Sequence, residues 1–249
     1  MIFFPHFTFK SITFVLTILY LILFIAEIIY IYTRQVQNDF TWNCSLFELQ
    51  NKYYPRVKFD YQVWRLLVSG FFHSNYAHFI LNVLGLQMYG YFVEWYYGKC
   101  KYVASIIVSV IFAGFFSNIA NMTSISTMPS AVLYCILGLK IYFLYEYRDY
   151  KKLTGRRIFI ILLLILIFGI NLIPVFTNNN VDYSSSLGTH SHYLGGFICG
   201  LLLGLFFHLH KVEEELTRCE KVLKFGSLVL LVISMILCCV LMFTLTVEE

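Results

Sequence analysis

The sequence predicts an all-α polytopic membrane protein with seven membrane spans, and three observations support this prediction. Of the 249 residues, 59% are hydrophobic and only 13% are charged, and the mean hydropathy is +0.72. Soluble domains contain about a quarter charged residues, and a soluble chain of this size would expose large apolar patches. The apolar residues also gather into runs that approach the roughly 20 residues needed to cross a bilayer. A cytosolic globular protein is therefore excluded.

Seven apolar runs follow one another along the chain. Four are long and uniformly apolar, while the second, fourth and sixth are shorter or begin with polar residues. In order they cover residues 12–32, 78–91, 102–119, 130–145, 158–173, 192–207 and 225–245. The first run has too long an apolar core for a signal peptide, and no small-residue cleavage site follows it. We therefore expect all seven runs to form transmembrane helices.

The loops between these spans predict the orientation and the domain organisation. With the N-terminus in the cytosol, twelve Lys and Arg residues lie on the cytosolic side and five on the other side. Cytosolic loops carry the excess of such residues, so we expect a cytosolic N-terminus and a lumenal or extracellular C-terminus, with the secretory pathway favoured. The chain then divides into a short cytosolic N-terminus (1–11), a six-helix membrane domain (12–210) that includes a long outer loop (33–69), and a cytosolic linker with the seventh helix (211–249).

Polar side chains that are costly inside a membrane mark a candidate site at the outer ends of the spans. His78 and Asn82 lie one helical turn apart, Ser130 opens the fourth span, and His192 begins the sixth. A serine near a histidine suggests a nucleophile and its general base, and a second histidine with an amide suggests oxyanion donors. Glycines on the sixth span allow a close approach to a neighbouring helix. If that neighbour is the fourth span, Ser130 and His192 come within hydrogen-bond reach.

Other interpretations of the same residues stay open. Ser130 is at a position where serine often caps a helix, and histidines at span ends are often satisfied by water or backbone carbonyls. A metal site would need His73, His78, His190 and His192, but the same outer ends lack carboxylate ligands. The seven cysteines are scattered without a C-x-x-C spacing and are expected to be buried small residues. Glu94 is expected to form an ion pair with Lys99 or Lys101.

Taken in chain order, these residues resemble the rhomboid family of intramembrane serine proteases. The resemblance covers residues of about 60 to 210. The segments that carry it are Trp64-Arg65, His73-x4-His78-x3-Asn82, Glu94-x3-Gly98, the helix that opens with Ser130, and His192-x2-Gly195.

The resemblance implies six core helices with a Ser–His dyad inside the membrane, to which the last span adds a seventh helix. Ser130 would attack the scissile carbonyl, His192 would take its proton, and His78 and Asn82 would hold the oxyanion. Trp64, Arg65, His73, Glu94 and Gly195 would have structural roles. The substrate would be a transmembrane segment of another protein, and no metal, organic cofactor or nucleic-acid partner is implied.

Two departures from the family pattern leave an alternative open, namely a non-catalytic family member that binds membrane-protein clients and affects their trafficking or degradation. The family's Gly-x-Ser-Gly segment reads Met128-Pro129-Ser130-Ala131 here, and Pro129 has no N–H to offer. If Gly196 and Gly200 are aligned with the family's glycines, Tyr193 falls at the position of the base instead of His192. One residue is about 100° of helix rotation, so the register decides between the alternatives.

Overall fold

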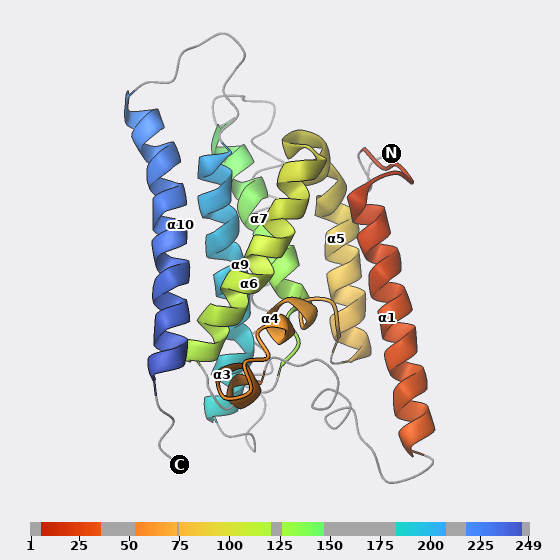
Figure 1. Ribbon diagram of the computed structural model, residues 1–249. Helices are drawn as coiled ribbons and strands as arrows, with labels where there is room; N and C mark the ends of the chain where they lie inside the picture. The colour runs from red at the N-terminus through yellow and green to blue at the C-terminus, as the bar shows by residue number, and fades with distance from the viewer. Residues whose placement is uncertain are drawn as a thin grey trace.

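The structure, a computed structural model, describes residues 6–35, 53–73, 75–120, 126–146, 183–207 and 218–245, and helices dominate this part of the chain. The helices are α1 (Ile12–Gln35), α3 (Tyr54–Lys58), α4 (Trp64–Val68), α5 (Tyr76–Tyr97), α6 (Lys99–Ala120), α7 (Pro129–Glu146), α9 (Tyr183–Phe206) and α10 (Arg218–Thr244). The long helices form a bundle with α1 at one edge and α10 at the other (Figure 1).

The chain is an all-α polytopic membrane protein, as the sequence predicts. Helices α1, α6 and α10 are long and apolar enough to cross a bilayer, and α7 and α9 contain shorter apolar stretches. The predicted span 158–173 lies outside the described residues. Helix α9 begins at Tyr183, well before the predicted start of its span. Hydropathy detects only the apolar part of a helix, so the Ser-, Thr- and His-containing turns that precede it were missed.

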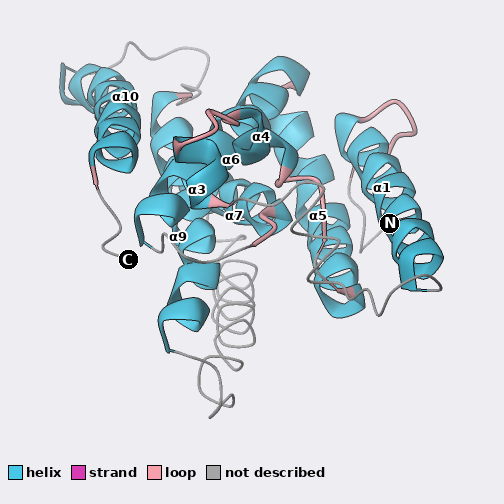
Figure 2. Ribbon diagram, turned by 60° about the horizontal axis from the view of Figure 1, so that its bottom comes forward, coloured by secondary structure: helices cyan, strands magenta, loops and turns pink. Residues whose placement is uncertain are grey.

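The long outer loop contains two short helices that the hydropathy pattern does not reveal. Figure 2 shows α3 and α4 lying across the end of the bundle at which α5 and α7 begin. The fully buried Tyr54 donates hydrogen bonds to the carbonyl groups of Met242 (3.0 Å) and Leu245 (2.8 Å) at the end of α10. Lys58 also donates to the Leu245 carbonyl. The last carbonyls of a helix have no partner within the helix, so α3 caps α10.

Glu94, on α5, caps the start of α1. Its carboxylate accepts hydrogen bonds from the backbone N–H groups of Ile12 (2.8 Å) and Thr13 (2.9 Å) and from the Thr13 hydroxyl (2.9 Å). A negative charge at the positive end of a helix is stabilising, and here it satisfies two N–H groups that have no partner within α1. The expected ion pair of Glu94 with Lys99 or Lys101 was wrong, because Lys99 instead donates to the Lys10 carbonyl and the Lys101 ammonium packs over the Phe207 ring.

Substitution Glu94→Ala is expected to destabilise the protein by about 1–3 kcal/mol, because it leaves buried donors at the start of α1 without an acceptor. The measurement is the thermal unfolding midpoint of the full chain in detergent micelles. Glu94→Gln keeps the size and one acceptor oxygen, so its midpoint should lie between those of the wild type and Glu94→Ala. A midpoint of Glu94→Ala equal to that of the wild type would contradict the capping role.

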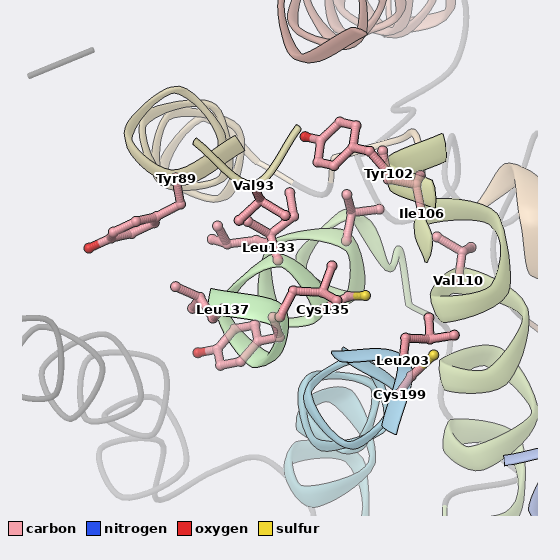
Figure 3. Close-up of a cluster of buried hydrophobic side chains, with 14 of the residues drawn as sticks. Tyr89, Val93, Tyr102, Ile106, Val110, Leu133, Cys135, Leu137, Cys199 and Leu203 are labelled. Atoms are coloured by element: carbon pink, nitrogen blue, oxygen red, sulfur yellow. The ribbon is translucent and has the colours of Figure 1, made fainter. Parts of the chain in front are cut away.

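The neighbour that the glycines of the sixth span approach closely, left open by the sequence, is the fourth span. A Cβ added to Gly196 or Gly200 of α9 would overlap the backbone carbonyl oxygen of Ala131 or Cys135 on α7, and one added to Gly138 of α7 would lie 2.6 Å from the Phe197 carbonyl oxygen. Side chains from α5, α6, α7 and α9 then pack into one hydrophobic core, part of which Figure 3 shows. The two backbones therefore touch, and only glycine fits between them.

Gly200→Ala is expected to lower the stability by at least about 1–3 kcal/mol, because its methyl group meets backbone that has no room to move. Gly226→Ala on α10 is the matched control, since a Cβ there meets nothing within 4 Å. Thermal unfolding midpoints of both variants test the prediction. Equal midpoints for the two variants would mean that α7 and α9 do not touch at Gly200.

Candidate functional site

Ser130 lies in the first turn of α7, where three local features hold it. Pro129 occupies the first position of the helix, which suits proline because the N–H it lacks would have no partner there. The preceding residue, Met128, is fully buried, and its N–H donates to the Ser69 carbonyl at the end of α4 (2.7 Å). Ser130 itself is only 4% exposed. Its hydroxyl is thus fixed inside the bundle, at the end where α4 and α5 meet α7.

His78 reaches Ser130 from the first turn of α5. The side chain of Asn75 caps this helix by accepting a hydrogen bond from the His78 N–H (2.8 Å). The Nε2 atom of His78 lies 2.7 Å from the Ser130 Oγ atom. The structure therefore brings together two of the predicted site residues, from positions 52 residues apart.

Asn82 lies one turn further along α5 and is 3% exposed. Its amide nitrogen donates a hydrogen bond to the His78 carbonyl (2.8 Å). The Asn82 Oδ1 atom is buried and has no hydrogen-bond partner among the described residues. One N–H of Asn82 is therefore directed to its own helix, and the amide as a whole lies beside the His78–Ser130 pair.

Tyr193 completes the surroundings of Ser130 from α9. Its ring stacks on the ring of Tyr134, with centroids 4.9 Å apart and an interplanar angle of 9°. Tyr134 follows Ser130 by one turn of α7, and the Tyr193 side chain is hydrogen-bonded to Ser130. Tyr193 also precedes Gly196 by three residues, so both lie on the side of α9 that faces α7.

His192 lies one residue before Tyr193 and is 2% exposed. Gly195, one turn later, faces α6, where an added Cβ would lie 2.9 Å from the Ala113 Cα atom. On the other side of His192, Ser191 donates to the Ser117 hydroxyl of α6 (2.9 Å). Ser191 and Gly195 thus turn toward α6, whereas Tyr193 and Gly196 turn toward α7. Its assignment as the general base stays a prediction, and sequence reasoning gave Tyr193 only as the alternative.

Three further predicted site residues, Trp64, Arg65 and His73, lie in α4 or in the loop that follows it. Arg65 is buried, stacks on the ring of Trp64 with its guanidinium carbon 4.8 Å from the ring centroid, and donates to the Gln62 side chain (2.6 Å). His73, in the loop between α4 and α5, is fully buried. Its ring contacts Tyr20 of α1 and His78, at centroid distances of 4.9 and 5.6 Å.

Burial, together with the nearby charge of His78, lowers the pKa of His73 from 6.5 to about 2. Above about pH 6.5 the imidazole is neutral in the folded and unfolded chains, and His73 has no effect on the pH dependence of stability. As the pH falls below about 6.5, only the unfolded chain takes up the proton. The folded state then loses up to about 1.4 kcal/mol of stability per pH unit.

His73→Phe is expected to reduce this loss of stability in acid, because phenylalanine keeps the buried ring and cannot take up a proton. The nitrogens of His73 have no hydrogen-bond partner among the described residues, so the variant should be as stable as the wild type at neutral pH. Thermal unfolding midpoints at pH 7.5 and 5 test this, with the exposed His6→Phe as control. An acid-induced loss in His73→Phe as large as that in the wild type would contradict the prediction.

Comparisons with known proteins agree with this arrangement of residues. The family model described as the Rhomboid domain matches residues 60–210. The chain is 26% identical over 215 residues to Rhomboid-like protease 1 of Toxoplasma gondii, covering 82% of this chain and 66% of the relative. It is 27% identical over 142 residues to Rhomboid protease GluP of Bacillus subtilis (strain 168), covering 57% of this chain and 26% of the relative.

A third relative, RHOMBOID-like protein 1 of Arabidopsis thaliana, is 28% identical over 151 residues, covering 61% of this chain and 36% of the relative. This chain therefore spans less than two thirds of the length of these three relatives. The Rhomboid match extends over more than half of the chain and includes α4, α5, α6, α7 and α9. The chain belongs to the rhomboid family.

Proposed function

We propose that this rhomboid-family member is proteolytically silent and binds transmembrane segments of client proteins. The observation that carries the proposal is the position of Tyr193. The contacts of Gly196 and Gly200 with α7 set the rotation of α9, and in that register Tyr193 stacks on Tyr134 and hydrogen-bonds to Ser130. In the alignment that matches these glycines to those of the family, Tyr193 occupies the position of the general base.

A tyrosine at this position does not perform the chemistry of the base. An imidazole has an unperturbed pKa near 6.5 and can accept the proton of a serine hydroxyl at neutral pH. A phenol has an unperturbed pKa near 10, so at neutral pH it already carries its proton and cannot accept another from serine. Tyr193 thus favours a Ser130 that is held in a hydrogen-bond network over a Ser130 that is activated as a nucleophile.

The segment around Ser130 also favours a silent site. Pro129 contributes no N–H to an oxyanion, and loss of a single oxyanion donor lowers turnover by a factor on the order of 10²–10³. One N–H of the Asn82 amide is directed to the His78 carbonyl of its own helix. The donors that would stabilise a tetrahedral intermediate are therefore fewer than the family pattern implies.

Client binding is supported by the features of the rhomboid pattern that are present in this chain. Two of the relatives named above carry the word protease in their names, and rhomboid proteases act on transmembrane segments. This chain retains the Trp64–Arg65 stack and the close α7–α9 contact. Ser130, His78 and Asn82 also provide polar groups within the bundle. Such groups can hydrogen-bond to the backbone of a client helix where it is unwound, which apolar lipid cannot do.

A second candidate function, serine endopeptidase, is favoured by one distance. The 2.7 Å separation of His78 Nε2 and Ser130 Oγ is suitable for proton transfer from a serine to an imidazole. In that case His78 would act as the base, or His192 would do so after a rotation of α9. Either version requires turnover that depends on Ser130.

The test is cleavage of a model transmembrane substrate in proteoliposomes by the wild type, Ser130→Ala, His78→Ala and His192→Ala. We expect the wild type to release no more product than Ser130→Ala does. Cleavage that disappears only in Ser130→Ala and in one of the histidine variants would overturn the silent assignment and identify the base.

A complementary variant combines Tyr193→His with Met128→Gly, Pro129→Ala and Ala131→Gly, which restores the family's base and the Gly-x-Ser-Gly segment. We expect product from this variant that is lost when Ser130→Ala is added, with Tyr193→Phe in the same background as the inactive control. Client binding is measured separately, by photocrosslinking of the model segment, and should be equal in the wild type and Ser130→Ala. Absence of crosslinking in both would refute the client-binding part of the proposal.

A further inference from the structure

The last turn of α10 is bound both by α3 and by α6. The buried hydroxyl of Tyr54 on α3 donates to the carbonyl groups of Met242 (3.0 Å) and Leu245 (2.8 Å). The Lys58 ammonium donates to the Leu245 carbonyl as well. From α6, the fully buried Asn118 donates through its amide nitrogen to the Met242 Sδ atom (3.5 Å). The end of α10 is therefore attached to the outer loop and to the bundle at the same time.

These contacts continue from α3 through α4 to the segment that opens α7. Leu66 of α4 is fully buried in one hydrophobic cluster with Tyr54 and Met242. Leu66 and Met128 both lie against Gly114 of α6, where an added Cβ would be 3.1 Å from each of the two side chains. The side chain of Leu66 thus links the end of α10 to Met128.

A backbone hydrogen bond then joins α4 to the start of α7. The Ser69 carbonyl, directly after α4, accepts from the Met128 N–H (2.7 Å), two residues before Ser130. Figure 2 shows α3 and α4 lying across this end of the bundle, and Ser130 is only 4% exposed. A continuous set of contacts therefore connects α10 to Ser130, although α10 lies at the edge of the bundle (Figure 1).

The position of α3 and α4 depends on contacts of this kind. Each helix has five residues, and helices so short are not stable on their own. Between them, Tyr61 has a φ of 53°, a left-handed conformation that is costly for an aromatic residue. The Tyr61 ring stacks on the ring of Phe243 in α10, with centroids 6.3 Å apart. Loss of the contacts with α10 would thus leave two short helices joined by a strained residue.

We propose that the last turn of α10 is a latch that holds α3 and α4 over Ser130, with the Tyr54 hydroxyl as its main attachment. While the latch is closed, the two short helices keep water away from the start of α7. When Tyr54 leaves α10, the helices move away from the bundle and Ser130 becomes accessible from the aqueous phase. The latch does not depend on whether the protein cleaves or only binds its clients.

The experiment measures access to position 130 in the full chain in lipid nanodiscs. Each chain carries Ser130→Cys and reacts with a water-soluble methanethiosulfonate, and the label taken up by the same chain with Ser130→Ala is subtracted. Tyr54→Phe removes the hydroxyl and keeps the ring. We expect about fivefold faster labelling with Tyr54→Phe, because one hydrogen bond within a protein contributes about this factor to an equilibrium.

The matched control is Tyr97→Phe. Tyr97 is also a buried tyrosine whose hydroxyl donates to a backbone carbonyl, that of Leu139 (3.0 Å), but it lies at the end of α5 away from Ser130. Labelling at position 130 should keep its original rate in this control.

Two outcomes would overturn the proposal. An unchanged labelling rate with Tyr54→Phe would mean that α10 does not control access to Ser130. Equal acceleration by Tyr54→Phe and Tyr97→Phe would mean that loss of any buried hydroxyl loosens the bundle. Thermal unfolding midpoints identify a variant that fails to fold. In that case Lys58→Met replaces Tyr54→Phe, because it removes the other donor to the Leu245 carbonyl and should accelerate labelling in the same direction.

Discussion

The backbones of α7 and α9 touch because Gly138 of α7 faces α9, and Gly196 and Gly200 of α9 face α7. This contact fixes the rotation of both helices about their axes. A helix that can move by even one residue turns its side chains by about 100°. A contact made by backbone atoms allows no such adjustment, since there is no side chain to repack. The side chains of α9 near Gly196, including that of Tyr193, therefore have the orientation that the glycines impose.

The same constraint links packing to chemistry at Ser130. Ser130 begins α7, and Tyr134 follows one turn later, so a residue of α9 that packs against Tyr134 also reaches Ser130. Among the described residues of α9, position 193 is the one that packs against Tyr134 and reaches Ser130. Under the proposed function, its occupant, tyrosine or histidine, determines whether α9 offers the serine a partner that can accept a proton, in addition to His78 of α5.

Much of this arrangement could be predicted from the sequence, and the limits of prediction have physical causes. Hydropathy identifies the spans, and polar residues at their outer ends indicate that His78 and Ser130 meet. The rotation of α9 could not be predicted because Gly195 and Gly196 are adjacent, and either one suits a close helix contact. In the structure each faces a different helix. The role of Glu94 was missed because its partners on α1 are more than 80 residues away in the chain and are backbone groups, which leave no mark in the sequence.

The hydrogen bonds between Tyr54 and the end of α10 join segments 188 residues or more apart. During synthesis the outer loop is complete long before α10 exists, so α3 meets its partner carbonyls only after α10 has formed. The loop over the Ser130 end of the bundle is then held by a helix that is made much later. The position of α3 therefore depends on the presence of α10. A chain that stops before α10 would leave the Tyr54 hydroxyl without these two carbonyl acceptors.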